Sequence, residues 1–458
     1  MFDVNIKIIT ELKSFLDICT SEHSVLDVFR CSKQDFTRNR KLSFPRLMLF
    51  IAKLCKKTLS LELDTFFENE LKNPQGSCSV SAFSQQRCKL KGFFFEVWNK
   101  VLCESFYHHG QGQTKRWNGY RVIAADGSAV SLISTKALAH HFGGQSNQCG
   151  TYTGAKAFLH YDVLNKLITF AQLATYRTGE LPMAYRAIDI LEEDTLTIYD
   201  RHFCNYKMVA LHRWAEGERH FVIRAKESQK FIALFIKSGA RSQEVNMFPT
   251  PDAIIELKKN GFIITAKTAL KVRLVRVDLP KGVTEVLLTD LWEDEVYRSE
   301  IFKDLYFMRW GVETSISVLK NLLQLESFSG QTVKSVEQDF FATIFMANLA
   351  ALITRQANEE REEKKLKKLL LKPPHVNNKR KTRDWPMQVN MNKATGKLRQ
   401  KLVGLFTSRT PDNILKQLVV YFEKHKLPIR KGRSFVRERK NKQTHCKHKT
   451  FTNYKPSI

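Results

Sequence analysis

The chain has 458 residues, of which 43% are hydrophobic, so it is long enough for two to four domains and too apolar to be a disordered polypeptide. Its formal net charge of +28 and its pI near 9.7 favour a polyanionic partner, with nucleic acid ahead of an anionic membrane. The nine cysteines are scattered without a C-x-x-C pair, which is typical of reduced thiols in a cytoplasmic protein.

Three further features are disfavoured by length or spacing. The best apolar run, residues 340–353, is shorter than the roughly 20 residues that a membrane span needs, so a buried helix explains it better. The first residues lack the basic and apolar segments of a signal peptide. Near the end of the chain, His445, Cys446 and His448 do not match the spacing of a zinc module.

Residues 1–115 are predicted to be helical. Apolar side chains recur at helical spacing over 44–67, and Pro45 suits a first helical turn. In segment 78–102, serines precede a predicted helix whose polar face would suit DNA phosphates or bases, although an ordinary solvated face explains it about as well. The residues of that face are Gln85, Gln86, Arg87, Lys89 and Lys91.

Strands are predicted from about residue 118 onward. Runs 120–132, 156–164 and 166–176 are strand-like, and the last two are joined by a short Asn165-Lys166 turn. A helix is predicted near 183–193, and the runs 195–203 and 220–226 are the next strands. Two aspartates stand out in this order: Asp126 lies in the first strand-like run, and Asp200 lies in the run after the helix.

Strong alternation predicts antiparallel β-structure over 254–279 and 284–291, within an interruption that spans 227–300. The next segment, 305–323, is predicted to be one helix. At about 100° per residue, four of its polar side chains fall within roughly 60° of one another. They are Tyr306, Arg309, Glu313 and Lys320. Taken singly, these features have structural explanations, such as an Arg309–Glu313 surface ion pair or an Asp126-Gly127 hairpin turn.

The combination of these motifs resembles one known group of proteins. The order Asp126, Asp200, Glu313 resembles the DDE triad of bacterial insertion-sequence transposases. The spacing Tyr-x2-Arg-x3-Glu-x6-Lys matches the YREK signature of one branch, the insertion-sequence-four (IS-four) family. Asp126-Gly127-Ser128 resembles the family's first motif. Residues 200–203 resemble its second, where glycine is commoner at the position of His202. The resemblance covers residues 40–355.

The resemblance implies an α/β fold with a ribonuclease-H-like catalytic core and a β-rich insertion, flanked by a helical N-terminal domain and a basic helical or irregular C-terminal region. The expected division is a DNA-binding domain at 1–115, the first part of the core at 116–226 and the insertion at 227–300, followed by the second part of the core with the YREK helix at 301–355 and the basic region at 356–458.

The resemblance also implies a DNA transposase that cuts its element at the terminal inverted repeats and joins the 3′ ends to target DNA, with a hairpin intermediate. Two Mg²⁺ ions, for which Mn²⁺ can substitute, would be held by Asp126 as the bridging ligand and by Asp200 and Glu313. Tyr306, Arg309 and Lys320 would bind the terminal phosphate of the non-transferred strand, since arginine forks onto phosphate and lysine supplies a point charge.

Two tryptophans near these motifs receive different interpretations. Trp292 is a candidate for stacking on a flipped base, although a packed core tryptophan is the simpler explanation, and Trp310 is expected in the core. Since two element ends must be held together, at least a homodimer on double-stranded DNA is expected, in the bacterial cytoplasm at the nucleoid and without a membrane partner.

Two alternative functions stay open. A metal-dependent nuclease without strand transfer would share the triad, and a catalytically silent DNA-binding protein derived from a transposase would share the ancestry, although the intact triad argues against it. Residues 355–458 carry 29 Lys and Arg against 8 Asp and Glu, a net charge of +21. Segment 358–372 is expected to be a charged helix stopped by Pro373-Pro374, and the last thirty residues to order only on a partner.

Overall fold

The structure is a computed structural model that describes residues 1–38, 40–55, 57–71, 76–147, 150–279, 283–370 and 386–429. The chain forms two compact units. The helical unit comprises residues 1–114, 130–155 and the chain from 318 onward, and the sheet unit comprises residues 115–129 and 156–317. The predicted division into five domains stays a prediction. The expectations for segment 373–385 and for the last thirty residues, including His445, Cys446 and His448, lie outside the described residues.

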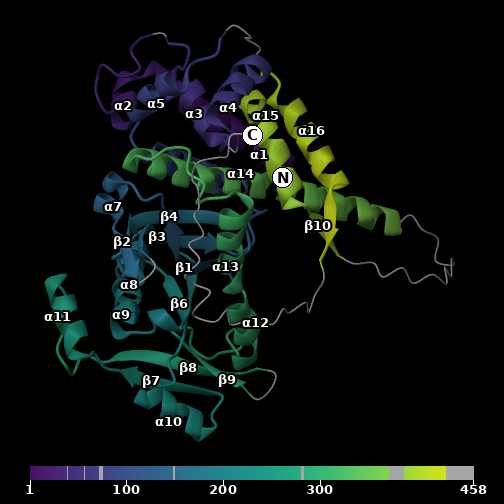
Figure 1. Ribbon diagram of the computed structural model, residues 1–458. Helices are drawn as coiled ribbons and strands as arrows, with labels where there is room; N and C mark the ends of the chain where they lie inside the picture. The colour runs from purple at the N-terminus through teal and green to yellow at the C-terminus, as the bar shows by residue number, and fades with distance from the viewer. Residues whose placement is uncertain are drawn as a thin grey trace. The chain divides into compact units, whose positions relative to one another are not determined.

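The helical unit begins with a run of helices, as predicted for residues 1–115 (Figure 1). The elements are α1 (Phe2–Ser21), α2 (His23–Phe29), α3 (Phe44–Ala52), α4 (Leu59–Thr65), the π-helical turn η1 (Phe66–Glu70), α5 (Val80–Cys88) and α6 (Phe94–His109). Pro45 lies in the first turn of α3, as expected. The Ser79 hydroxyl accepts a hydrogen bond from the Ala82 amide and so caps α5, which confirms that serines precede this helix.

A long helix, α14 (Val333–Leu370), forms the core of this unit. It is long and apolar enough to cross a membrane, but 83% of its most apolar window is buried inside the protein. Phe345 stacks on Trp98 of α6 with ring centroids 4.1 Å apart, and Asn348 donates to the Asn99 side chain at 2.7 Å. The prediction of a buried helix over 340–353 is therefore confirmed. The chain continues through α15 (Met391–Thr407) and α16 (Pro411–Lys424).

Shorter elements complete the helical unit. They are α7 (Lys136–Phe142), β2 (Gly144–Asn147), the π-helical turn η5 (Val318–Leu322), β10 (Met387–Val389) and β11 (Lys426–Pro428). Strand β2 pairs antiparallel with the start of β3 (Gly150–Asp162), and β10 pairs antiparallel with β11.

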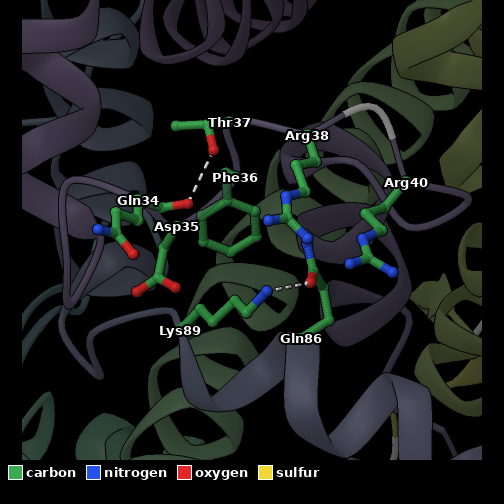
Figure 2. A pocket seen from close by; sticks show the side chains of 8 residues that line it. All are labelled: Gln34, Asp35, Phe36, Thr37, Arg38, Arg40, Gln86 and Lys89. Atoms are coloured by element: carbon green, nitrogen blue, oxygen red, sulfur yellow. Dashed lines mark hydrogen bonds between the residues drawn. The ribbon is translucent and has the colours of Figure 1, made fainter.

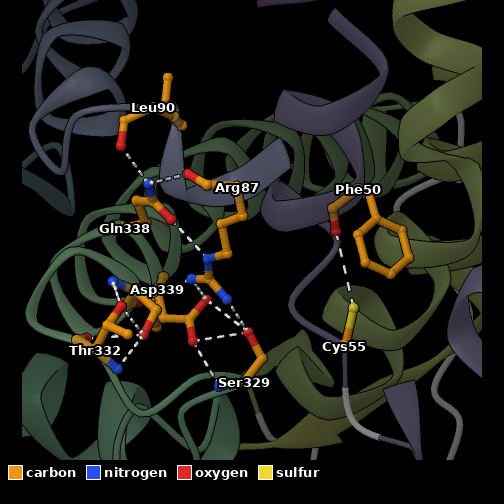
Figure 3. A network of polar contacts seen from close by, with 10 residues as sticks. Phe50, Cys55, Arg87, Leu90, Ser329, Thr332, Gln338 and Asp339 are labelled. Carbon is orange, nitrogen blue, oxygen red and sulfur yellow. Dashed lines mark hydrogen bonds and ion pairs between the residues drawn. The ribbon is translucent and has the colours of Figure 1, made fainter. Parts of the chain in front are cut away.

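The polar face predicted on α5 is partly a structural network (Figure 3). Arg87 is 4% exposed and its guanidinium donates to the Gln338 and Asp339 side chains, the Ser329 hydroxyl and the Ser335 carbonyl. Gln86 is also buried and donates to the Leu42 carbonyl. The prediction that these two residues reach DNA is wrong, because their donors bind the protein's own groups.

The sheet unit has the strand order β4-β3-β1-β5-β6-β9-β8-β7. Strand β1 is parallel to β5, and β5 is parallel to β6. Strands β3 and β4 form the predicted hairpin around Asn165-Lys166, and helix α8 precedes β5 as predicted. Helix α9 was not predicted from the sequence. The elements are β1 (Arg121–Ser131), β3, β4 (Leu167–Thr175), α8 (Glu180–Ile188), β5 (Thr195–Tyr199), η2 (Arg201–Phe203), α9 (Tyr206–Trp214) and β6 (Arg219–Arg224). This order and pairing confirm an α/β fold of the ribonuclease-H-like kind.

The central strands are buried on both faces, as parallel strands are in α/β folds. On β1 and β5, Val122 and Leu196 pack with α12 residues such as Phe302 in one core cluster, whereas Ile123 and Tyr199 pack with α8 residues such as Met183 in another. Because side chains alternate along a strand, each strand contributes to both clusters. The sheet unit is therefore a sheet between two helical layers.

The interruption between β6 and α12 contains both helices and strands. It consists of α10 (Lys230–Ser238), β7 (Ser242–Met247), α11 (Pro251–Lys259), β8 (Leu270–Leu279) and β9 (Val283–Thr289). Strands β8 and β9 are antiparallel as predicted, and β9 pairs with β6, so the interruption extends the sheet. The predicted β-structure over 254–269 is wrong, and only 270–279 of that run is a strand. Residues up to 259 form α11, with Pro251 in its first turn and a Thr250 cap that accepts from the Ala253 amide, and 260–269 contain no strand.

A buried arginine joins the inserted strands to the segment before α12 (Phe302–Phe307). Arg273 on β8 is fully buried; it donates to the Leu291 and Tyr297 carbonyls and to the Ser299 hydroxyl. Its guanidinium carbon lies 5.2 Å from the centre of the Phe302 ring. This side chain fixes the start of α12 against the sheet.

The predicted single helix over 305–323 is interrupted. It divides into α12, a tight turn at Met308–Arg309, α13 (Trp310–Ser317) and η5. At the turn the Arg309 and Val312 amides bond three residues back, to the Tyr306 and Arg309 carbonyls. The turn lies beside Gly311, where an added Cβ would be 3.1 Å from the Val163 side chain. Gly311, the weakest helix former of this segment, therefore lies where the helix tightens against the sheet.

Candidate active site

The register of two parallel strands brings Asp126 and Asp200 together. In the β1–β5 pair, Arg121 lies opposite Thr195 and Ala124 lies opposite Ile198. Continued by two residues, this register would bring Asp126 level with Asp200, which follows the end of β5 at Tyr199. The Asp200 charge acts on the pKa of Asp126, so the two carboxylates are near one another. Both positions share strand parity with Leu196 and Ile198, which face the α12 layer. The two predicted aspartates therefore lie side by side below α12.

Asp126 is in an environment that opposes its ionisation. Burial raises its pKa to about 7; a hydrogen bond from the Gly127 amide at 2.8 Å and the Arg309 charge lower the pKa, while the Asp200 and Glu180 charges raise it. At neutral pH the carboxyl is therefore poised between its two forms. A cation beside it would favour the carboxylate.

Asp200 follows β5 and caps the short helix η2. Its Oδ1 accepts a hydrogen bond from the His202 amide at 2.6 Å. The backbone of His202 is not in the left-handed region, and its side chain is exposed, so this position does not require the glycine that is commoner in the family.

Tyr306, Arg309 and Glu313 surround the tight turn between α12 and α13. Arg309 is 7% exposed and donates from Nη2 to Glu313 Oε1 at 2.7 Å, so the ion pair between these two residues does form. Burial lowers the pKa of Arg309, but the hydrogen bond to Glu313 raises it above its ordinary value, which keeps the guanidinium charged. Burial raises the pKa of Tyr306, which is therefore a neutral hydroxyl. The Asp126 charge also acts on Arg309.

Lys320 belongs to the helical unit, in η5. Its Nζ lies 3.3 Å from Glu326 Oε1, and the same carboxylate oxygen accepts a hydrogen bond from the Ser131 amide at 3.0 Å. The structure thus brings Asp126, Asp200, Tyr306, Arg309 and Glu313 into one unit and places Lys320 in the other.

The two tryptophans differ from the simple core assignment. Trp310 is 48% exposed and lies over the Arg309 guanidinium, 4.7 Å from ring centre to Cζ, so the prediction of a core position is wrong. Trp292 is half-buried, with Lys271 Nζ 5.1 Å and Arg213 Cζ 6.0 Å from its ring centre. Its stacking on a flipped base stays a prediction.

Sequence reasoning missed Glu180 and its partner Lys156. Glu180 is the first residue of α8, and its carboxylate lies against the backbone of Gly127, next to Asp126. Lys156 Nζ is 3.5 Å from Glu180 Oε1. The available signal was an acidic residue in the first turn of the helix that follows a predicted hairpin, a position that also suits the helix dipole.

Comparisons with known proteins give the family of the chain. Residues 117–349, which are more than half of the chain, match the family model described as the transposase DDE domain. The chain is 22% identical over 348 residues to the transposase InsG for insertion sequence element IS4 of Escherichia coli (strain K12), covering 72% of this chain and 70% of that protein. Among solved structures, the piggyBac transposase in a synaptic complex with hairpin DNA aligns with a TM-score of 0.42 and 12% identity, covering 100% of this chain and 91% of that one.

The fold and the site define a DDE transposase, a metal-dependent enzyme that cuts and joins DNA. The chain belongs to the family of transposases with a DDE domain.

The donor set of the site fits the divalent metal that this family requires. Carboxylate oxygens are the ligands that hard divalent cations prefer, and a cation would relieve the repulsion between Asp126 and Asp200. In the described residues, Glu11, His108 and His109 of the helical unit bring their ligand atoms within 4.8 Å of one another. The carboxylates of the triad do not form such a close group in the described residues.

Proposed function

We propose that this transposase cuts an insertion-sequence element at its terminal inverted repeats and joins the freed 3′ ends to target DNA, with Asp126, Asp200 and Glu313 as its metal ligands. The observation that carries this proposal is the parallel β1–β5 pairing, which holds Asp126 on β1 near Asp200, directly after the end of β5. Glu313 follows on α13, in the same unit. Rigid elements are what a phosphoryl-transfer site needs, because its rate depends on positioning.

Two Mg²⁺ ions would supply charge neutralisation at the phosphate and a nucleophilic oxygen at neutral pH. Asp126 would bridge them, and Asp200 and Glu313 would each hold one. The raised pKa of Asp126 supports this assignment, since a bound cation stabilises its carboxylate. Water is the nucleophile that frees each 3′ hydroxyl, and these hydroxyls attack in the hairpin and strand-transfer steps.

The phosphate-binding role belongs to Tyr306, Arg309 and Lys320. Arg309 is charged and buried, and within the described residues its guanidinium hydrogen-bonds to Glu313 through Nη2, which leaves other donors for a ligand. Arginine presents a planar fork that matches phosphate oxygens. Substituting Arg309 or Lys320 with alanine should impair hairpin formation or strand transfer more than end binding. Normal transposition by both variants would remove them from this role.

A reaction at two element ends requires two active sites on one DNA complex, which supports at least a homodimer on double-stranded DNA, in the cytoplasm at the nucleoid. The expected substrate ends are imperfect inverted repeats that flank the gene and are themselves bracketed by short direct repeats.

Incubation of the protein with labelled flanking DNA and Mg²⁺ tests the proposal. A transposase nicks at the repeat boundary and then joins the end to target DNA. Cleavage without joining would identify the nuclease alternative, and binding without cleavage would identify a silent DNA-binding protein.

A further inference from the structure

Glu180 packs directly on the backbone that follows Asp126. A Cβ atom built on Gly127 would lie 2.5 Å from Glu180 Cγ, 2.7 Å from its Cδ and 3.0 Å from its Oε1. These distances are far below van der Waals contact, so a side chain at position 127 would displace the glutamate. The glycine beside Asp126 therefore makes room for a carboxyl group from another element.

The position of Glu180 is fixed by its surroundings. Helix α8 buries Met183, Ala184 and Ala187 in the core, which holds its first turn at the end of the hairpin. A carboxylate is favoured in the first turn by the helix dipole. Lys156 on β3 pairs with Glu180 and also lies over the Tyr176 ring, with Nζ 5.6 Å from the ring centre.

This arrangement adds a negative charge to a site that already contains Asp126 and Asp200. Like charges that are partly buried repel one another unless a cation lies among them. Lys156 offsets part of the charge, but its side chain is 24% exposed, so solvent weakens that pairing.

We propose that Glu180 is a positioning residue of the active site, which supports the Asp126-Gly127 backbone and adds a fourth negative charge that strengthens divalent-cation binding. The proposal rests on the assignment of Asp126, Asp200 and Glu313 under the proposed function. By pairing with Glu180, Lys156 reduces the negative charge that the cation experiences.

The two members of the Glu180–Lys156 pair provide the test, because they should act with opposite sign. Mn²⁺ affinity is measured on the DNA-free full-length protein by electron paramagnetic resonance. Glu180→Gln should weaken binding about tenfold, as for other residues that support metal ligands. Lys156→Gln should bind Mn²⁺ at least as tightly as wild type. Glu256→Gln, which removes a carboxylate paired with Lys207 at 2.8 Å on exposed α11, should change nothing.

The controls separate the possible failures. A purely structural ion pair predicts the same change in Mn²⁺ affinity and melting temperature for Glu180→Gln and Lys156→Gln, and that result would overturn the proposal. Asp126→Asn tests the underlying site. If Asp126→Asn loses Mn²⁺ and Glu180→Gln does not, only the role of Glu180 is wrong. If neither variant loses Mn²⁺, the assignment of the metal site is wrong as well.

A second, independent observation concerns a pocket in the helical unit. Figure 2 shows it between the loop that follows α2 and the C-terminal end of α5. The volume of the pocket is about 440 Å³. Its polar lining carries three cations and one carboxylate. The lining residues are Gln34, Asp35, Phe36, Thr37, Arg38, Arg40, Gln86 and Lys89.

The two arginines of this pocket are not neutralised by the protein. Within the described residues, neither Arg38 nor Arg40 has an ion pair, whereas Asp35 accepts from the Ser32 amide and Lys89 donates to Gln86. Phe36, in the pocket, has a φ of 60°, a rare value for an aromatic residue, and its ring packs on Phe44 with centroids 5.3 Å apart. Arg38 and Arg40 thus present two guanidinium groups to a concave polar surface.

We infer that this pocket binds a backbone phosphate of DNA, because two arginines without carboxylate partners among the described residues match phosphate oxygens. Contacts to backbone phosphates carry no sequence information. Gln86, predicted to reach DNA from α5, instead lines the pocket as a buried amide.

The salt dependence of DNA binding tests this inference. Arg38→Gln with Arg40→Gln should flatten the slope of log affinity against log salt by about 0.9 for each phosphate that the pocket neutralises, on a random-sequence duplex. Lys7→Gln with Lys100→Gln removes the same charge from exposed positions of α1 and α6 and should leave the slope nearly unchanged. Equal effects of the two pairs would show that only net charge matters and would overturn the inference.

Discussion

Two buried arginines, one in each unit, illustrate how differently a protein uses the same side chain. Arg87 and Arg309 are 4% and 7% exposed, and both were predicted to contact DNA. Arg87 has hydrogen-bond partners in Gln338, Ser329, Ser335 and Asp339, all within its own unit. Arg309 binds Glu313. A guanidinium that makes four hydrogen bonds to the protein supports the fold, whereas one that makes a single bond among the described residues has donors for a ligand.

The largest effect on cleavage is expected from loss of any of the three carboxylates that we propose as metal ligands. Asp126→Ala, Asp200→Ala and Glu313→Ala should each reduce cleavage at least about 1,000-fold, because each removes a proposed metal ligand. Binding to element ends should stay nearly unchanged, since the carboxylates serve the metal and not DNA affinity. Gel-shift and cleavage assays on the same preparations measure both quantities. Cleavage at the wild-type rate by any of the three would exclude that residue from the triad.

The two arginines should respond in opposite ways. Arg87→Met should lower the free energy of unfolding by about 3 kcal/mol, because it removes the charged partner of the Asp339 carboxylate, whose side chain is only 13% exposed. Arg309→Met should lower it by less than about 1 kcal/mol, because Glu313 is 34% exposed and water can replace its partner. Urea unfolding measures both.

Joining activity should show the reverse order. Arg309→Met should lose about 100-fold in strand joining, and Arg87→Met should retain its activity at temperatures where it is folded. If Arg309→Met proves the less stable variant, the distinction between structural and functional arginine is wrong.

The pKa of Asp126 predicts a smaller, pH-dependent effect. Its folded-state pKa of about 7 lies above the ordinary 3.8, so the folded protein binds the proton more tightly, and stability falls as pH rises from about 4 to 7. Asp126→Asn removes this dependence. In divalent-free buffer, the variant should gain about 2 kcal/mol relative to wild type between pH 4 and pH 8, a discounted fraction of 1.36 kcal/mol per pKa unit. Urea unfolding at the two pH values measures the gain, and equal differences at both would show that Asp126 titrates normally.

The smallest expected effect concerns the end of the chain. Residues 355–458 carry a net charge of +21, and truncation after Pro428 removes ten cations and one carboxylate. The truncated protein should bind any duplex more weakly and with a flatter salt slope, while its preference for element ends persists. An unchanged salt slope combined with lost pairing of ends would identify this segment as an assembly element.

Much of the catalytic fold could be predicted because its signals are local. The alternation in β1, β5 and β6, the Asn165-Lys166 turn, and the aspartates in β1 and directly after β5 are read from neighbouring residues. The role of Arg87 could not be predicted this way, because its partners lie 242 to 252 residues away along the chain. Its sequence neighbourhood, rich in Gln and Lys, resembles a solvated helix face.

Other differences arise from competing local signals and from packing. The segment 254–259 alternates like a strand, but the Thr250 cap and Pro251 start α11 just before it. The YREK segment has uniform helical periodicity, yet it tightens at Met308–Arg309, where Gly311 approaches Val163. Glu180 could not be found from the sequence because its relation to Asp126 is created by the hairpin that precedes α8.

The buried Arg273 gives the inserted strands a mechanical role. Its hydrogen bonds hold the Leu291 and Tyr297 carbonyls against β8, only a few residues before α12. Because α12 leads directly to Arg309 and Glu313, a displacement of β8 either carries that segment with it or breaks the hydrogen bonds of a fully buried cation. The insertion therefore anchors the segment that leads to Glu313. We expect changes in its length to be tolerated around α10 and α11, but not along β8 and β9 or in β7, which pairs with β8 and whose Ser242 hydroxyl accepts a hydrogen bond from Arg273.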